Sequence, residues 1–171
     1  MAENERFLNL YKVYEYLRDN PISASMTSKL LRRPDVIYFE TRLRQELEEM
    51  NGVIIGEHSH SNNPREDFLK ETNQVWYWLS VASVSRRLSY EEINPYNSLI
   101  EGLEQGYNQF PSISFSSLDK LKTSFKETMD YVGDACRIFS VSPREIAEYD
   151  LAQMKNRPYL KDILTELGFA S

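Results

Sequence analysis

The sequence predicts an all-α protein, and three features support this. Apolar residues recur at three- and four-residue spacing along most of the 171-residue chain, which is the period of an amphipathic helix. Capping residues stand where these stretches begin, and proline-containing pairs such as Asn20-Pro21 and Asn94-Pro95 interrupt them. The chain is long enough for one domain with a sizeable core. We therefore expect residues 1–171 to form a single all-α domain, folded as a helical bundle.

Local signals place the individual helices. Asp35 is the expected N-cap of a long helix, and Ser89 and Ser142 each precede a helix start that fits a capping box. The polar stretch EHSHSNNPRED is expected to be a loop. The expected helical stretches cover approximately residues 3–19, 25–33, 36–56, 64–87, 89–93, 96–105, 117–139, 143–156 and 160–167.

Composition limits the classes of partner. The net charge is −6 and the isoelectric point is near 5.1, which argues against nucleic acid as a general partner. The single cysteine, Cys136, excludes an intrachain disulfide framework and is expected to be a small buried residue. No stretch is apolar enough to cross a bilayer, and the N-terminus MAENERFLNL lacks the pattern of a secretion signal. A cytoplasmic protein without a membrane partner is expected.

Two segments of the chain resemble each other. Residues 70–79 have the sequence KETNQVWYWL and residues 126–135 have KETMDYVGDA. The pair Glu46 and Glu49 recurs as Glu101 and Glu104, 55 positions later. We therefore predict two tandem repeats, with the N-terminal helix outside them. The repeats are expected at residues 36–93 and 96–157.

Paired acids three residues apart share one face of a helix. Many such pairs only line a solvated surface. If two pairs face each other across antiparallel helices, however, four carboxylates can converge on one point, as they do in bundle metal sites. Oxygen ligands of this kind suit Mg²⁺, which also binds substrate phosphates.

The order of these motifs is similar to that of the MazG-like all-α nucleotide pyrophosphohydrolases, a group that includes phosphoribosyl-ATP pyrophosphohydrolases and dimeric dUTPases. That family carries E-E-x-x-E on one helix and E-x-x-D on the next. Residues 45–49, QELEE, followed by 71–74, ETNQ, resemble this signature, and so do residues 100–104, IEGLE, followed by 127–130, ETMD. The capped segment 142–157 resembles the basic helix that follows. The likeness covers approximately residues 36–157.

The resemblance implies a duplicated bundle in which the second repeat holds the site. The first repeat is the degenerate one, because Gln45 and Gln74 replace acids, whereas only Ile100 does so in the second. In the last helix Asp150 and Gln153 stand where the family has Asn and Lys. The implied catalytic and Mg²⁺-binding residues (with Mn²⁺ as a second candidate ion) are Glu101, Glu104, Glu127 and Asp130, and the implied phosphate-binding residues are Lys155 and Arg157.

The implied activity is Mg²⁺-dependent hydrolysis of a nucleoside triphosphate to a monophosphate and pyrophosphate. The alternative is a catalytically inactive relative that acts as a nucleotide-binding, interaction or regulatory module. A homodimer is an expected assembly if the duplication does not already supply the interface that single-repeat relatives make with a second chain.

Two further features suggest weaker hypotheses. His58 and His60, together with Glu57, suggest a transition-metal site, although two histidines in a Ser/Asn-rich loop are more often solvent-exposed polar residues. One or two of the rings at residues 76–78 could stack on a base, while core packing is the expected role of the others.

Overall fold

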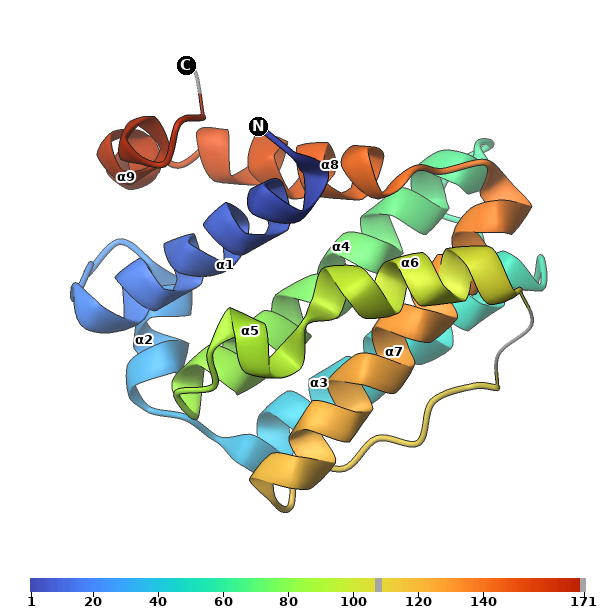
Figure 1. Cartoon of the computed structure of the whole chain (residues 1–171), viewed down its shortest axis with the longest axis horizontal. Coiled ribbons are helices and arrows are strands. Elements are labelled where there is room, and N and C mark those ends of the chain that lie inside the picture. Colours follow the sequence, from blue (N-terminus) through green and yellow to red (C-terminus); the bar gives the residue numbers. More distant parts are fainter. Residues whose placement is uncertain (107–108, 170–171) are drawn as a thin grey trace.

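The computed structural model describes residues 1–106 and 109–169, and every regular element in these ranges is helical. This confirms the predicted all-α bundle (Figure 1). The elements are α1 (Glu3–Asp19), α2 (Met26–Arg32), α3 (Val36–Ile54), α4 (Pro64–Ser85), α5 (Tyr90–Ile93), α6 (Pro95–Gln105), α7 (Leu118–Phe139), α8 (Pro143–Lys155), a 3₁₀ turn (Pro158–Leu160) and α9 (Lys161–Glu166).

Side-chain caps begin most of these helices at the residues that the sequence indicates. Asp35 accepts a hydrogen bond from a backbone N–H in the first turn of α3, and Ser89 and Ser142 each form a complete capping box. Helix α4 begins at Pro64, and the Asn63 side chain caps it by accepting from the next two backbone N–H groups. Because these caps satisfy N–H groups that would otherwise lack partners, the helix starts follow from local sequence.

Helix α4 lies at the centre of the bundle. It packs against α1, α2, α3, α7 and α8, and 15 of its 22 residues are buried. The ring of Trp76 packs edge to face against Phe7 of α1 and Phe125 of α7, with distances between ring centroids of 5.5 and 5.9 Å. The N-terminal helix, which has no counterpart in the predicted repeats, therefore covers one side of α4.

Helices α3 and α4 form an antiparallel pair. Near the start of α3, Phe39 packs against Trp78 in the second half of α4, with ring centroids 6.1 Å apart. Near the end of α3, the sulfur of Met50 lies 3.6 Å from the hydroxyl of Thr72, nearer the start of α4. An antiparallel pair of helices is the arrangement that we assumed from the sequence for a site with four carboxylates.

Helices α6 and α7 run in the same direction, which differs from the antiparallel arrangement expected for the second pair of acids. Glu101 lies 3.6 Å from Lys126, and further along both helices Gly106 lies beside Arg137. Figure 1 shows the two helices side by side, with the connecting segment returning along the molecule. The two helix pairs therefore differ in direction, and the tandem duplication stays a prediction.

The segment that joins α6 to α7 makes this parallel arrangement feasible. It contains 12 residues, 106–117, and an extended chain of that length spans about 40 Å, well beyond the roughly 16 Å of α6. Arg44 and Arg86 donate hydrogen bonds to its carbonyls at Ile113 and Phe115, each at 2.6 Å. The side chain of Phe115 is buried in the core.

Two glycines bring α6 and α7 into backbone contact. A Cβ atom on Gly102 would lie 1.9 Å from the carbonyl oxygen of Asp130, and one on Gly133 would lie 2.2 Å from the carbonyl oxygen of Leu99. Neither position can accept a side chain without separating the helices. The small residues therefore set the distance between α6 and α7.

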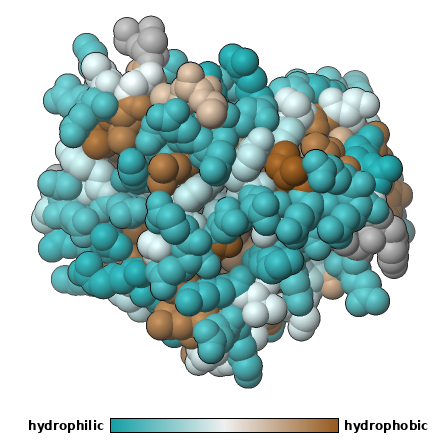
Figure 2. Space-filling view, viewed as in Figure 1, coloured by the Kyte–Doolittle hydropathy of each residue, from teal (hydrophilic) through white to brown (hydrophobic). Residues whose placement is uncertain are grey.

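The surface of the bundle is largely polar. Figure 2 shows one face covered mainly by hydrophilic side chains, with apolar groups in small separate patches. Among the described residues, no helix combines the length and the apolar character needed to span a membrane. Buried apolar side chains from α1 through α9 belong to one hydrophobic cluster.

Gly102→Ala is expected to destabilise the protein by about 2–3 kcal/mol or more, because overpacking a tight helix contact forces the backbones apart. Chemical denaturation measures the change in the free energy of unfolding. Glu104→Ala on the exposed face of the same helix is the control and is expected to stay within about 0.5 kcal/mol. Equal effects of the two substitutions would contradict the close approach.

Candidate metal centre

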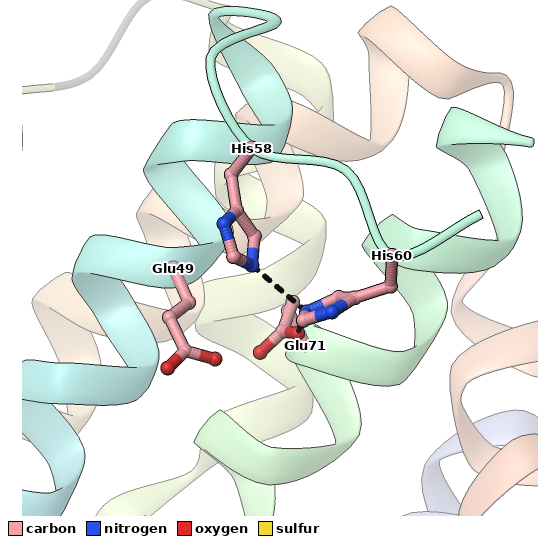
Figure 3. A group of neighbouring side chains, drawn as sticks. All are labelled: Glu49, His58, His60 and Glu71. Atoms are coloured by element: carbon pink, nitrogen blue, oxygen red, sulfur yellow. Dashed lines mark hydrogen bonds and ion pairs between the residues drawn. The ribbon is translucent and has the colours of Figure 1, made fainter. Parts of the chain in front are cut away.

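Four side chains from the α3–α4 pair converge on one point (Figure 3). Glu49 lies on α3, Glu71 on α4, and His58 and His60 on the loop between them. Their ligand atoms all lie within 4.8 Å of one another, and no other such set of His, Cys, Asp or Glu occurs in residues 1–106 and 109–169. Two imidazole nitrogens and two carboxylate oxygens suit a divalent transition ion.

The loop folds back onto α3 because residue 52 is a glycine. The backbone N–H groups of Glu57 and His58 donate to the carbonyl of Gly52 at 2.8 and 3.0 Å. A Cβ atom on Gly52 would lie only 2.7 Å from the Cβ of His58. A larger residue would therefore displace His58 from the cluster.

Asp67 fixes the other end of the loop from the first turn of α4. Its buried carboxylate accepts the backbone N–H groups of His60 and Ser61 at 3.1 and 3.2 Å, and the Ser61 hydroxyl at 2.9 Å. Burial raises the pKa of Asp67, but the hydrogen bonds from Ser61 and His60 outweigh it, so the pKa lies below its ordinary value. An ionised Asp67 thus holds His60 beside α4.

Hydrogen bonds alone cannot satisfy both contacts of the His60 Nε2 atom. Its Nε2 atom lies 2.9 Å from Nε2 of His58 and 2.5 Å from Oε1 of Glu71. An imidazole nitrogen carries either one hydrogen or one lone pair, and neither can serve both neighbours well. A cation placed among the three atoms would attract every lone pair at once.

Glu71 is the most buried member of the cluster. Its side chain is only 2% exposed, and its Oε2 atom has no hydrogen-bond partner among the described residues. Burial raises the pKa of Glu71, the neighbouring His60 opposes this, and the Glu49 charge adds to it. A buried carboxylate with an unpaired oxygen costs free energy unless a positive charge lies beside it, and a metal ion would provide that charge.

A third carboxylate adjoins the cluster. Glu46 is buried on α3 and accepts a hydrogen bond from Arg42 at 2.8 Å. Burial raises its pKa to about 7, with Glu49 and Glu71 contributing in the same direction and Arg42 opposing. The α3–α4 pair therefore brings together three acids, Glu46, Glu49 and Glu71.

The predicted quartet on α6 and α7 is arranged differently. Glu104 and Glu127 are exposed, while Glu101 and Asp130 are half-buried. Glu101 accepts a hydrogen bond from Asn97 at 3.0 Å and pairs with Lys126. Burial raises the pKa of Asp130, Lys126 opposes this, and the Glu101, Asp134 and Glu127 charges add to it. These carboxylates influence one another electrostatically, but they are not part of the ligand-spaced group, and their metal role stays a prediction.

The two predicted phosphate-binding residues lie at the end of α8. Lys155 and Arg157 are both exposed. Helix α8 packs against α1 and α4, and Arg157 lines a cavity together with Gln74 of α4. Arg157 is thus placed beside α4.

Asp150 is completely enclosed beneath that cavity. Its two oxygens accept hydrogen bonds from Asn73 Nδ2 and Trp76 Nε1, each at 3.0 Å, and Tyr14 adds a third. Burial raises the pKa of Asp150 to about 6, although these three donors oppose the shift. Asp150 is therefore a buried acid at the junction of α1, α4 and α8.

The three aromatic side chains at residues 76–78 lie in different environments. Trp76 lies in the core, Trp78 packs on α3 with Arg42 5.3 Å from its ring centroid, and Tyr77 lines the cavity. Cys136 is buried, as predicted, and burial raises its pKa to about 12. Of the three rings, Tyr77 is the one with access to a ligand.

Sequence reasoning named each metal-centre residue but did not group them. Glu49 and Glu71 were assigned to a weakened repeat, and His58 and His60 were connected with Glu57 instead of with the helices on either side. A usable signal was present in the short loop with Gly52 before it and Asp67 after it, since a loop closed at both ends must lie over the helix pair that it joins.

Comparisons with protein-family models, curated proteins and solved structures found no match to this chain. The MazG-like resemblance therefore stays a prediction from the motifs.

The wild-type protein is expected to bind one Mn²⁺ or Zn²⁺ ion at the α3–α4 cluster. Saturation at about 100 times Kd stabilises the folded state by about 2.7 kcal/mol, which corresponds to a rise in Tm of about 5–10 °C for a chain of this size. Differential scanning calorimetry with and without metal measures the shift. His60→Ala and Glu71→Gln are expected to abolish it.

Glu127→Gln is the matched control, because it removes a carboxylate from the predicted quartet and leaves the cluster intact. It is expected to retain the full rise in Tm. If Glu127→Gln abolishes the rise and His60→Ala retains it, the metal lies between α6 and α7 and the assignment to α3–α4 is wrong.

Asp150 is expected to make the protein less stable as pH rises from about 4 to about 6. Its pKa is raised from 3.8 to about 6 on folding, so the folded state binds the proton more tightly and loses this advantage as the carboxyl ionises. Asp150→Asn does not titrate. The difference in unfolding free energy between wild type and variant, followed by urea denaturation, is expected to fall by up to about 3 kcal/mol over this range. If this difference in unfolding free energy does not change with pH, the raised pKa of Asp150 is contradicted.

Proposed function

We propose that this protein is a metal-dependent nucleoside triphosphate pyrophosphohydrolase whose ion is held by Glu49, His58, His60 and Glu71. The observation that carries the metal site is the buried Oε2 atom of Glu71, which has no hydrogen-bond partner among the described residues while lying within the cluster. The nucleotide part of the proposal rests on the order of the acidic motifs in the sequence.

The donor set supports a transition ion in preference to Mg²⁺. Mg²⁺ takes oxygen ligands almost exclusively, whereas Mn²⁺, Co²⁺ and Zn²⁺ accept imidazole together with carboxylate. Such an ion would polarise a phosphoryl oxygen and lower the pKa of a bound water. Asp67 would position the ligand His60, because its buried carboxylate accepts the backbone N–H of His60, and Glu71, itself a ligand, contacts the ring of His60.

The cluster is reachable from solvent. An open depression beside it is lined by Gln45, Glu48, Glu49, Gly52, Glu57 and His58, and Glu49 and His60 are themselves exposed. A catalytic metal site differs from a structural one in keeping a position open for water or substrate. Since the depression carries three acids, a bound cation would be the group that attracts a phosphate there.

The second candidate function is a module without catalytic activity, in which the same ion only closes the α3–α4 hairpin. The acidic lining of the depression favours this alternative, because carboxylates repel a triphosphate. The two functions share the metal site and differ only in turnover, so metal binding alone does not separate them.

Pyrophosphate release is the discriminating measurement. Purified protein with a panel of NTPs and dNTPs is expected to turn over at least one nucleotide in Mn²⁺, Co²⁺ or Zn²⁺. Glu71→Gln and His60→Ala are expected to lower the rate by at least about 100-fold, since each removes a ligand that holds the ion. Glu127→Gln is expected to stay within about twofold of wild type, because Glu127 is exposed on α7, outside the cluster.

Metal binding without turnover of any nucleotide would reject the enzymatic proposal and leave the hairpin-closing role. Loss of turnover in Glu127→Gln, with His60→Ala fully active, would instead return the chemistry to the quartet on α6 and α7.

A further inference from the structure

We infer that the cavity between α1, α2, α4 and α8 is a binding pocket for a nucleotide-type ligand, namely a heteroaromatic ring that carries a phosphate. This inference deepens the proposed function and rests on it for the link to hydrolysis, but the pocket itself does not require the metal. The cavity measures about 260 Å³. This is close to the roughly 300 Å³ at the lower end of small-molecule sites, which suits one ring system.

The walls of the cavity suit a flat ring. They include the aromatic side chains of Tyr14, Tyr77 and Tyr159, with Leu17 and Met154 among the aliphatic groups. Aromatic faces stack on planar heterocycles with little loss of conformational entropy. The hydroxyl of Tyr77 lies 2.8 Å from that of Thr27, so this ring is held in place before a ligand arrives.

Three polar side chains on the cavity wall are uncommitted. Gln74, Gln153 and Arg157 line the cavity, and within the described part of the chain none of these side chains forms a hydrogen bond or an ion pair. Each carboxamide offers both a donor and an acceptor, which matches the edge of a nucleobase. Arg157 supplies five donors and a permanent charge, which matches a phosphate.

The floor of the cavity is rigid. Asp150 is fixed by Asn73 and Trp76, and Asn73 itself is buried. The polar groups of the floor therefore keep their positions without a ligand, and the flexible recognition groups lie above them. Convergent polar groups of this kind fix the orientation of a bound ligand.

The cavity and the metal centre follow each other along α4. Gln74 lies three residues after Glu71, an axial rise of about 4.5 Å. On α8, Tyr149 adjoins Asp150; burial raises the pKa of Tyr149, and the charges of Glu66 and Glu71 raise it further. Along the axis of α4, Gln74 in the cavity thus lies less than one helical turn from Glu71 in the cluster.

Isothermal titration of metal-free protein in EDTA tests the pocket apart from catalysis. The probes are AMP, GMP, CMP and UMP with the four corresponding nucleosides. At least one nucleotide is expected to bind more tightly than its nucleoside. Arg157→Ala is expected to weaken that nucleotide about tenfold, towards the nucleoside's affinity, since a hydrogen-bonded charge contact is worth about 1.5–3 kcal/mol.

Gln74→Leu and Gln153→Leu are expected to reduce the preference among bases by about fivefold or more, because a site that hydrogen-bonds a base edge loses discrimination when the amide is removed. Lys12→Ala, which removes an exposed charge on α1 outside the cavity, is the matched control and is expected to bind as wild type does. Unchanged circular dichroism confirms that each variant is folded.

Failure of all eight probes to bind at millimolar concentration would overturn the inference, and so would binding that the three cavity variants leave unchanged. Either result leaves metal-dependent turnover standing if that is observed. Conversely, cavity binding without turnover rejects the enzymatic proposal and supports the pocket.

Discussion

The burial of most of α4 is the constraint on which the rest of the structure depends. The helix packs against α1, α2, α3, α7 and α8, and each of its buried polar side chains needs a protein partner or a ligand, because solvent does not reach it. Asp67 is satisfied by the loop before it, and Asn73 and Trp76 by Asp150. Of the two carboxylate oxygens of Glu71, Oε1 contacts His60, but Oε2 has no hydrogen-bond partner in the described structure. Trp78 Nε1, Ser80 Oγ and Ser83 Oγ of α4 are also buried without a hydrogen-bond partner in the described structure, but among these atoms only Glu71 Oε2 belongs to the candidate metal centre.

The direction of the helices decides which carboxylates meet. In the antiparallel α3–α4 pair the joining loop is short and closes over the end of the pair, which delivers His58 and His60 to the acids of both helices. In the parallel α6–α7 pair the connecting segment runs back beside α7 (Figure 1), and Arg44 and Arg86 hold its carbonyls at Ile113 and Phe115. Close contact between the helices at two glycines accompanies the ion pair of Glu101 with Lys126.

The same helix connects the two candidate sites. One face of α4 presents Glu71 towards α3 and its loop, and the turn that follows presents Asn73 and Gln74 towards α8. Metal binding at Glu71 and ligand binding at Gln74 would therefore share a rigid support, which is the arrangement that holds reacting groups in a fixed geometry. Arg157 would supply the positive charge that the acidic depression beside the metal centre lacks.

The sequence by itself determined the helices, their caps and the apolar faces, because these follow from interactions within three or four residues of one another. Asp35, Ser89 and Ser142 cap helices where they were expected to, and Phe39, Leu43 and Met50, which are spaced four and seven residues apart, are all buried on α3. Only the tertiary structure decided which acids come together. Glu101 and Glu127 match the motif at least as well as Glu49 and Glu71, but a motif carries no information about whether two helices run parallel or antiparallel. The 12-residue connection allows α6 and α7 to run parallel and two glycines let them approach closely, while the fold of the other pair places two histidines beside its acids as candidate ligands.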